Sequence, residues 1–204
     1  MRHRKRGRVL GRSPSHRKAL LQNLTKALIL TADPDAEGDG APKVKGRIIT
    51  TMPKAKEVRS MVEKCITIAR KGLAAQEKAA EFSTSAERGT EAWNAWRKSD
   101  NWNKWAQAMA PAVNARRRVV SLLNESGSST QKGDKRVVRI LFDHVAPQFV
   151  DRPGGYTRVV KLAKPRLGDA GQRALLEFVG IRDRVSQKST APSFDDQPAP
   201  ATAE

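Results

Sequence analysis

The sequence has few of the residues on which enzymes and extracellular proteins depend. Its 204 residues include one cysteine, Cys65, one tyrosine and three scattered histidines, His3, His16 and His144. A single cysteine excludes an intramolecular disulfide, and the cysteine and histidine spacing of a zinc site is absent. The sequence therefore predicts no enzyme activity, no metal and no cofactor.

Long apolar runs and phosphate-binding loops are missing as well. The basic N-terminal run is not followed by the apolar stretch that a secretory signal needs, and no window approaches the length of a membrane span. There is no loop of the GxxxxGK type, and Gly154 and Gly155 precede a predicted strand, which favours a tight turn over a nucleotide cradle. We expect a soluble protein with no membrane partner and no small-molecule substrate.

Acidic residues are absent from the N-terminus, where basic residues are dense. The opening MRHRKRGRVLGRSPSHRKAL carries eight Arg and Lys residues in its first eighteen positions, and no carboxylate occurs before position 33. Such an arm would repel itself in a free protein, whereas on a nucleic acid each neutralised phosphate releases counterions. The composition predicts contact with RNA or DNA.

The remaining charge is distributed in blocks. Residues 1–30 carry +9, 33–42 carry −4, 43–73 carry +7, 74–112 carry 0, 113–184 carry +8 and 185–204 carry −2, within a net charge of +18. Three basic blocks thus alternate with neutral or acidic ones. Because Arg and Lys dominate these blocks and aromatic residues are few, we expect most contacts to go to phosphate and sugar rather than to bases.

Periodicity predicts several elements in the first half of the chain. A helix begins near Ser13 and ends near Leu30, and a short β-branched strand covers residues 47–51. A second helix follows, with Pro53 in its first turn and Gly72 as its C-terminal stop. Its buried stripe comprises Ala55, Val58, Val62, Cys65 and Ala69.

The second half predicts further helices and a strand pair. Residues 74–125 favour helices, with Pro111 expected to kink or end one, and residues 134–149 form another amphipathic helix. Residues 156–163 and 173–181 look like two antiparallel strands, and the proline-rich residues after Val185 are expected to be disordered.

Several segments together resemble one known family. MRHRK, SPSHRKALLQNL, ITTMPKAKEVR, LFDHVAPQFVDRPGGYTRVVKL and ALLEFVG are similar, in order and spacing, to bacterial-type large-subunit ribosomal protein seventeen, the bL17 family. The resemblance covers residues 1–30, about 43–73 and about 135–181. It implies an α+β fold, with a small three-stranded mixed sheet packed against helices.

The resemblance also implies a role and a setting. The role is that of a structural constituent of the large subunit, with large-subunit ribosomal RNA and neighbouring ribosomal proteins as partners. Because no import presequence precedes MRHRK, the expected setting is the cytoplasmic ribosome of a bacterium. We expect a basic arm at 1–14, a core domain from 15–73 and 126–184, a tryptophan-containing helical insertion at 74–125 and a disordered tail at 185–204.

RNA-binding residues follow from the resemblance position by position. They are Arg2, His3, Arg4, Lys5, Arg6, Arg8, Arg12, His16, Arg17, Lys18, Lys54, Lys56, Arg152, Gly154, Gly155, Tyr156 and Arg158. Lys54 and Lys56 lie at a helix start, where backbone N–H groups already favour phosphate. For Tyr156, packing on a helix and stacking on a base both remain open.

Two other functions use the same features. A DNA-binding or nucleoid-associated protein could use the arm, but an acidic loop follows the first helix where a recognition helix should be. An RNA-modifying enzyme would need a reactive site, and the sequence offers none.

All four tryptophans lie in TEAWNAWRKSDNWNKWAQAMAPAV. Trp93 and Trp96, and likewise Trp102 and Trp105, are three residues apart, which predicts two short helices that each present an indole pair, with Asp100 as a possible cap between them. Internal packing, contact with a neighbouring ribosomal protein and base stacking are the three possible roles. The neutral charge of residues 74–112 favours internal packing over base stacking.

Overall fold

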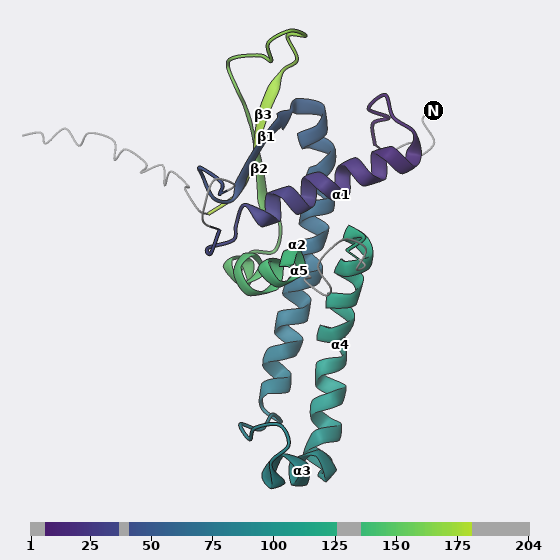
Figure 1. The fold of residues 1–204 in the computed structure, drawn as a ribbon, viewed down its shortest axis with the longest axis vertical. Coiled ribbons are helices and arrows are strands. Elements are labelled where there is room, and N and C mark those ends of the chain that lie inside the picture. Colours follow the sequence, from purple (N-terminus) through teal and green to yellow (C-terminus); the bar gives the residue numbers. More distant parts are fainter. Residues whose placement is uncertain (1–6, 37–40, 126–135, 181–204) are drawn as a thin grey trace, which may run out of the picture.

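The fold is α+β, as the resemblance implied, and consists of a body and a long helical hairpin (Figure 1). The computed structural model describes residues 7–36, 41–125 and 136–180. The first six residues of the predicted arm and the predicted disordered tail lie outside the described residues. No helix within these ranges has both the length and the apolar character needed to cross a membrane.

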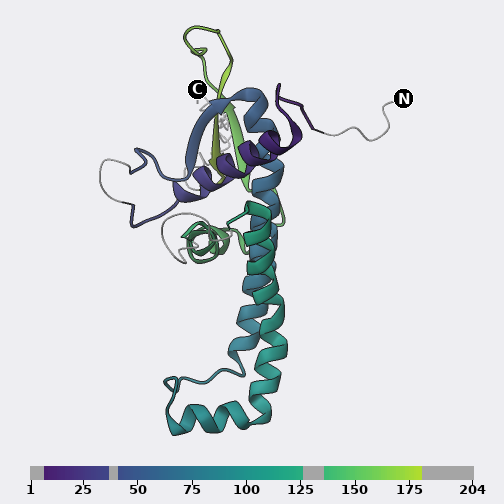
Figure 2. The ribbon, with the colours of Figure 1, turned by 45° about the vertical axis from the view of Figure 1, so that its right-hand side comes forward.

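The elements follow one another in a simple order. They are α1 (Pro14–Leu30), β1 (Arg47–Thr51), α2 (Met52–Ala80), α3 (Glu91–Lys98), α4 (Asp100–Leu123), α5 (Arg136–Ile140), the π-helix η1 (Leu141–Val145), the 3-10 helix η2 (Ala146–Phe149), β2 (Thr157–Lys161) and β3 (Arg173–Phe178). Helix α2 passes from the body into the hairpin, where α4 lies beside it and α3 crosses their far end (Figure 2).

The three strands form an antiparallel sheet, so the expectation of a mixed sheet was wrong. The strand order is β1-β3-β2, with Arg47 opposite Glu177 and Thr157 opposite Phe178. Because β3 lies in the centre and runs against both neighbours, β1 and β2 share a direction without pairing. The predicted antiparallel pair of the last two strands is confirmed.

Helix α2 carries the predicted apolar stripe but does not end at Gly72. All five stripe residues are fully buried, and the helix continues to Ala80. Gly72 lies where α2 meets α4 and η1: a Cβ atom built there would be 2.9 Å from the Cβ of Ala115 and 3.0 Å from Cε1 of Phe142. Gly72 therefore allows α4 and η1 to pack closely against α2, and it does not end the helix.

Helix α4 also continues through a residue expected to interrupt it. Pro111 is exposed inside the helix, and the residues beyond it, Ala112, Ala115, Val119 and Leu123, are buried. The packing of this apolar face on α2 outweighs the hydrogen bond that proline removes. The last turns of the predicted insertion therefore contribute to the body's core.

The helical stretch after residue 136 changes its winding along its length. It passes from α5 to η1 and then η2, and it buries the predicted inward residues Val138, Leu141, Phe142, Val145 and Phe149. Together with α1, α2, the last turns of α4 and the inner face of the sheet, these side chains form one core.

Candidate nucleic-acid interface

The described end of the arm is attached to the start of α2. Arg8 Nη1 lies 3.4 Å from Glu57 Oε1 and donates a hydrogen bond to the carbonyl oxygen of Pro53 at 3.5 Å. The chain turns sharply here, with positive φ at Gly7, Leu10 and Gly11. Arg2, His3, Arg4, Lys5 and Arg6 lie outside the described residues.

Two predicted groups of basic residues meet at this corner. Lys54 and Lys56 follow Pro53 in the first turns of α2, and Lys56 directly precedes Glu57, which Arg8 contacts. Lys56 is exposed, Lys54 is half-buried, and neither forms an ion pair with a residue that the structure describes. The arm and the α2 start thus form one basic corner.

Arg12 and His16 join the arm to α1. Arg12 Nη1 lies 2.6 Å from Nε2 of His16, one turn further along the chain. Arg17 is half-buried, and Lys18 is exposed on the next position of α1. Only part of this run therefore faces solvent.

The structure places the predicted turn at residues 152–155 away from that corner. Arg70, well along α2 from Lys54 and Lys56, donates a hydrogen bond to the carbonyl oxygen of Arg152. Arg152 Nε donates to the carbonyl oxygen of Gly154 at 3.2 Å, and Gly155 has a φ of 65°, as a tight turn requires. Both glycines face open space, so the backbone of this turn is accessible.

The side chains of Tyr156 and Arg158, which follow the turn, form contacts within the protein. Tyr156 is 1% exposed, and its ring packs against Phe149 at a centroid distance of 5.2 Å. Its hydroxyl oxygen accepts a hydrogen bond from Nη1 of Arg70 at 2.8 Å. The buried ring supports packing rather than base stacking. Arg158 donates to Oε1 of Glu177 through Nε at 2.8 Å and Nη2 at 2.6 Å.

A basic groove, hereafter the α1–α2–α4 groove, lies where these three helices meet. It has a volume of about 360 Å³ and is lined by Lys18, Met61, Lys64, Ile68, Arg118, Ser121 and Leu122. Each helix contributes one cation, no carboxylate lines the groove, and none of the three cations forms an ion pair with a described residue. Met61, Ile68 and Leu122 provide apolar surface beside the charges.

Sequence reasoning missed two of these cations. Lys64 and Arg118 are 54 positions apart, and only the packing of α4 on α2 brings them together. The available signal was their membership of the second and third basic blocks. Within the triplet at 116–118, Arg116 lies 4.6 Å over the ring of Phe142 and 4.0 Å from Asp143, while Arg117 and Arg118 remain exposed.

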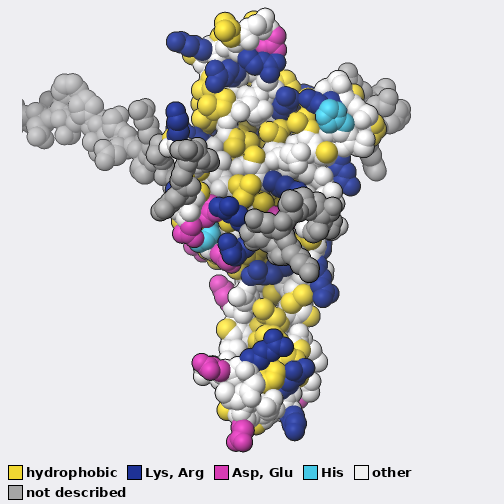
Figure 3. Space-filling view, in the orientation of Figure 1, with side chains coloured by type: hydrophobic (Ala, Val, Ile, Leu, Met, Phe, Trp, Pro, Cys, Tyr) yellow, Lys and Arg dark blue, Asp and Glu magenta, His cyan; other side chains and the backbone are white. Residues whose placement is uncertain are grey.

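Among the charged side chains on the face seen in Figure 3, Lys and Arg are more common than Asp and Glu. Lys and Arg side chains occur from the top of the molecule down to the hairpin, whereas the acidic ones in this view are fewer and lie mainly toward its edges. Among the described residues, no group of three or more His, Cys, Asp or Glu side chains could hold a metal ion. The surface suits a polyanion.

Comparison with known proteins gives a consistent result. The family model for ribosomal protein L17 matches residues 43–179, a range that runs across the predicted insertion. The large ribosomal subunit protein bL17 of Rhodopirellula baltica is 56% identical over 200 residues, covering 98% of this chain and 90% of that protein. The bL17 proteins of Nitratidesulfovibrio vulgaris and Thermus thermophilus are each 35% identical, over 87% and 88% of this chain and 87% and 99% of their own lengths. The chain belongs to the bL17 family of large ribosomal subunit proteins.

Proposed function

We propose that the chain is a structural constituent of the bacterial large ribosomal subunit that binds its ribosomal RNA through two basic surfaces of the body. One is the corner formed by the arm and the start of α2, and the other is the α1–α2–α4 groove. The role is structural rather than catalytic, in the cytoplasmic ribosome, with large-subunit RNA and neighbouring ribosomal proteins as partners.

The groove is the observation that carries this proposal. Three cations from three different helices converge there without a carboxylate to neutralise them. In a free protein this arrangement is repulsive, whereas a phosphate placed among them releases counterions and forms charge-assisted hydrogen bonds. The cations contact phosphate and the apolar side chains between them contact sugar, so recognition depends mainly on RNA shape.

The arm extends the same interface. Its predicted contacts, Arg2 to Arg6, precede Arg8, which contacts Glu57 in the same turn of α2 as Lys54 and Lys56. Backbone N–H groups at the start of α2 favour a phosphate at this position. The exposed turn at residues 152–155 would contact RNA from a different side of the body.

The test removes the three groove cations together. In the full chain, Lys18→Ala/Lys64→Ala/Arg118→Ala should weaken binding to large-subunit RNA and lower the slope of log affinity against log salt by about 2 units, since each phosphate contact on irregular RNA contributes about 0.7. Filter binding at several salt concentrations measures this slope, and circular dichroism verifies the fold.

A matched control removes the same charge elsewhere. Lys78→Ala/Lys98→Ala/Lys104→Ala takes three lysines from the distal hairpin, outside the groove. This variant should keep the wild-type slope. Equal losses in the two triple variants would show that only net charge matters and would refute the groove as an interface.

A further inference from the structure

The far end of the hairpin carries a second pocket, hereafter the tip pocket. It has a volume of about 440 Å³ and is lined by Ser83, Thr84, Ala86, Arg88, Trp93, Trp96, Arg97, Trp102 and Trp105. The loop after α2, helix α3 and the first turns of α4 all contribute. All four tryptophans of the chain line this one pocket.

The indole rings hold one another in fixed positions. Trp96 meets Trp102 edge-on at a centroid distance of 5.1 Å, and Trp102 stacks with Trp105 at 5.1 Å. Trp96 Nε1 donates to the carbonyl oxygen of Phe82 at 3.1 Å. The four rings are nevertheless only half-buried, so a preorganised aromatic surface remains open to a ligand.

The tip pocket is positively charged although its surroundings are neutral. Arg97 lies 5.2 Å over the ring of Trp93 and 5.4 Å over that of Trp102, and Arg88 is exposed at the rim. No carboxylate lines the pocket, and neither arginine forms an ion pair with a residue that the structure describes.

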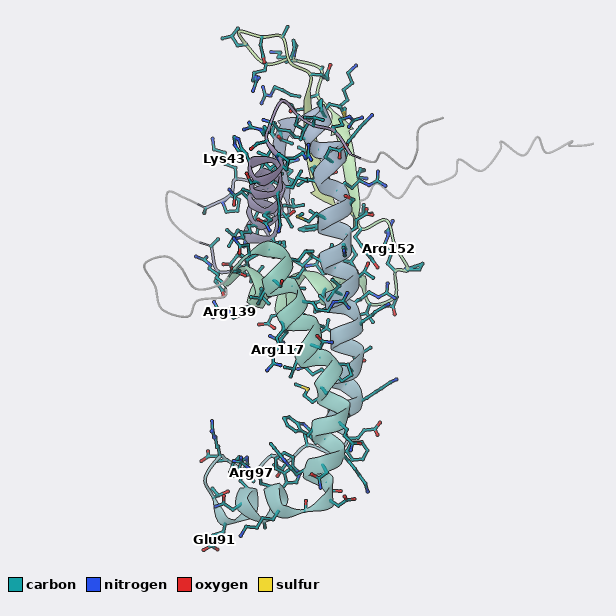
Figure 4. All side chains as sticks on the ribbon, turned by 90° about the vertical axis from the view of Figure 1, so that its right-hand side faces the viewer. Lys43, Glu91, Arg97, Arg117, Arg139 and Arg152 are labelled. Atoms are coloured by element: carbon teal, nitrogen blue, oxygen red, sulfur yellow. The ribbon has the colours of Figure 1, made fainter. Side chains whose placement is uncertain are left out.

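The compensating acids lie elsewhere on the tip. Glu87, Glu91 and Asp100 are exposed and do not line the pocket. In Figure 4, Glu91 lies at the outer edge of α3, whereas Arg97 lies on its inner side. Residues 74–112 have no net charge, which argued against base stacking. In the folded tip, however, the arginines line the pocket and these acids lie outside it.

We propose that the tip pocket binds one unpaired nucleotide of RNA, with the base against the indoles and its phosphate at Arg88 and Arg97. Indole faces stack on bases of any kind, and guanidinium groups bind phosphate through paired N–H donors. A hollow lined by flat rings and cations fits a planar anionic group. The proposal rests on the proposed function, since an unpaired nucleotide is at hand only if the protein binds ribosomal RNA.

Tryptophan fluorescence of the full chain tests this site selectively, because every indole lies in the pocket. A single-stranded oligoadenylate should quench the emission, since a stacked base quenches an indole. The same strand in a duplex, and inorganic polyphosphate, should leave it unchanged. Quenching by polyphosphate, or none by the single strand, would overturn the proposal.

Two variants and a control assign the effect to the pocket. Arg88→Ala/Arg97→Ala should raise the quenching midpoint about tenfold, and Arg88→Ala alone, which removes an exposed side chain, should raise it a few-fold. Lys98→Ala/Lys104→Ala, which removes the same charge from the tip but not from the pocket lining, should keep the wild-type midpoint. A midpoint shifted equally by the control would refute the site.

Cross-linking in assembled subunits identifies the occupant. Burial of Cys65 raises the pKa of its thiol to about 12, so Ala86→Cys supplies a single reactive thiol at the pocket for a photoreactive label. A cross-link to ribosomal RNA supports the proposal, and one to a protein overturns it. The groove variant Lys18→Ala/Lys64→Ala/Arg118→Ala should retain quenching by oligoadenylate, so the tip pocket and the proposed function can fail independently.

Discussion

Gly72 shows how one missing side chain sets the distance between helices. Gly72→Ala adds a methyl group only 2.9 Å from the Cβ of Ala115, and that short side chain cannot rotate away. The gain in helix propensity of about 1 kcal/mol is smaller than an overpacking penalty of about 1–3 kcal/mol. We expect the free energy of unfolding in urea to fall by about 1 kcal/mol.

A double-variant cycle provides the control. Ala115→Gly removes the nearest atom, so Gly72→Ala should be tolerated better in that background than in the wild-type chain. A Gly72→Ala protein more stable than the wild type would show that the helices separate at little cost.

A second prediction at the residue scale concerns the pH dependence of Asp33. This carboxylate is 5% exposed and accepts from Arg136 through Nε at 3.0 Å and Nη2 at 2.6 Å. The Arg136 hydrogen bonds hold the pKa of Asp33 below its ordinary value. The stabilisation is therefore present above the unfolded pKa of about 3.9 and is lost as pH falls through the folded pKa.

Asp33→Asn should lower the free energy of unfolding by about 1 kcal/mol near neutral pH, a modest value because Arg136 remains half exposed. The gap between variant and wild type should close as denaturation is measured at pH values below about 4. Asp151→Asn, at an exposed position, is the control and should change little at either pH. A gap that does not vary with pH would contradict the ion-pair interpretation.

At the scale of elements, α4 contains a proline in its interior, which lowers the stability of the helix, yet the helix continues because its apolar face packs on α2. Pro111 lies inside the helix and is exposed, so its missing N–H and ring clash are not offset by contacts of its own. Pro111→Ala should raise the free energy of unfolding by about 1–2 kcal/mol, less than the full proline penalty because the unfolded chain also gains freedom.

The control is Asn114→Ala, an exposed substitution one turn further along α4. Its effect should stay below about 1 kcal/mol, since it changes helix propensity alone. Loss of stability in Pro111→Ala would mean that the proline shapes the helix for its contact with α2.

At the scale of the whole molecule, the proposed RNA interface combines two separate basic surfaces, the arm with the start of α2 and the α1–α2–α4 groove. Deletion of residues 2–12 should leave the fold intact, because no described residue of the arm belongs to the core. It should reduce the log–log salt slope of RNA binding by about 3 to 4 units if about five phosphate contacts are lost. Titrations of the deletion variant at several salt concentrations measure the change.

Because the arm and the groove are different surfaces, the two losses should add. The deletion combined with Lys18→Ala/Lys64→Ala/Arg118→Ala should lower the slope by about 5 to 6 units. An unchanged slope after the deletion alone would show that the arm faces solvent rather than RNA.

Features that depend on near neighbours were predictable from sequence. The strand at residues 47–51, the stripe of α2 and the pairing of β2 with β3 each follow from a short repeat of apolar and polar residues. The net charge of the arm and the family motifs are also properties of the linear chain. These linear properties are sufficient to identify a bL17 protein.

Features that depend on distant residues were decided by tertiary packing. Gly72 ends no helix because α4 and η1 pack against it, and Pro111 ends none because the residues beyond it are buried. The convergence of Lys18, Lys64 and Arg118, and the separation of Arg88 and Arg97 from the acids around them, arise because helices fix which side chains share a surface. A sequence counts charges along a line, whereas a phosphate or a base responds to charges arranged in space.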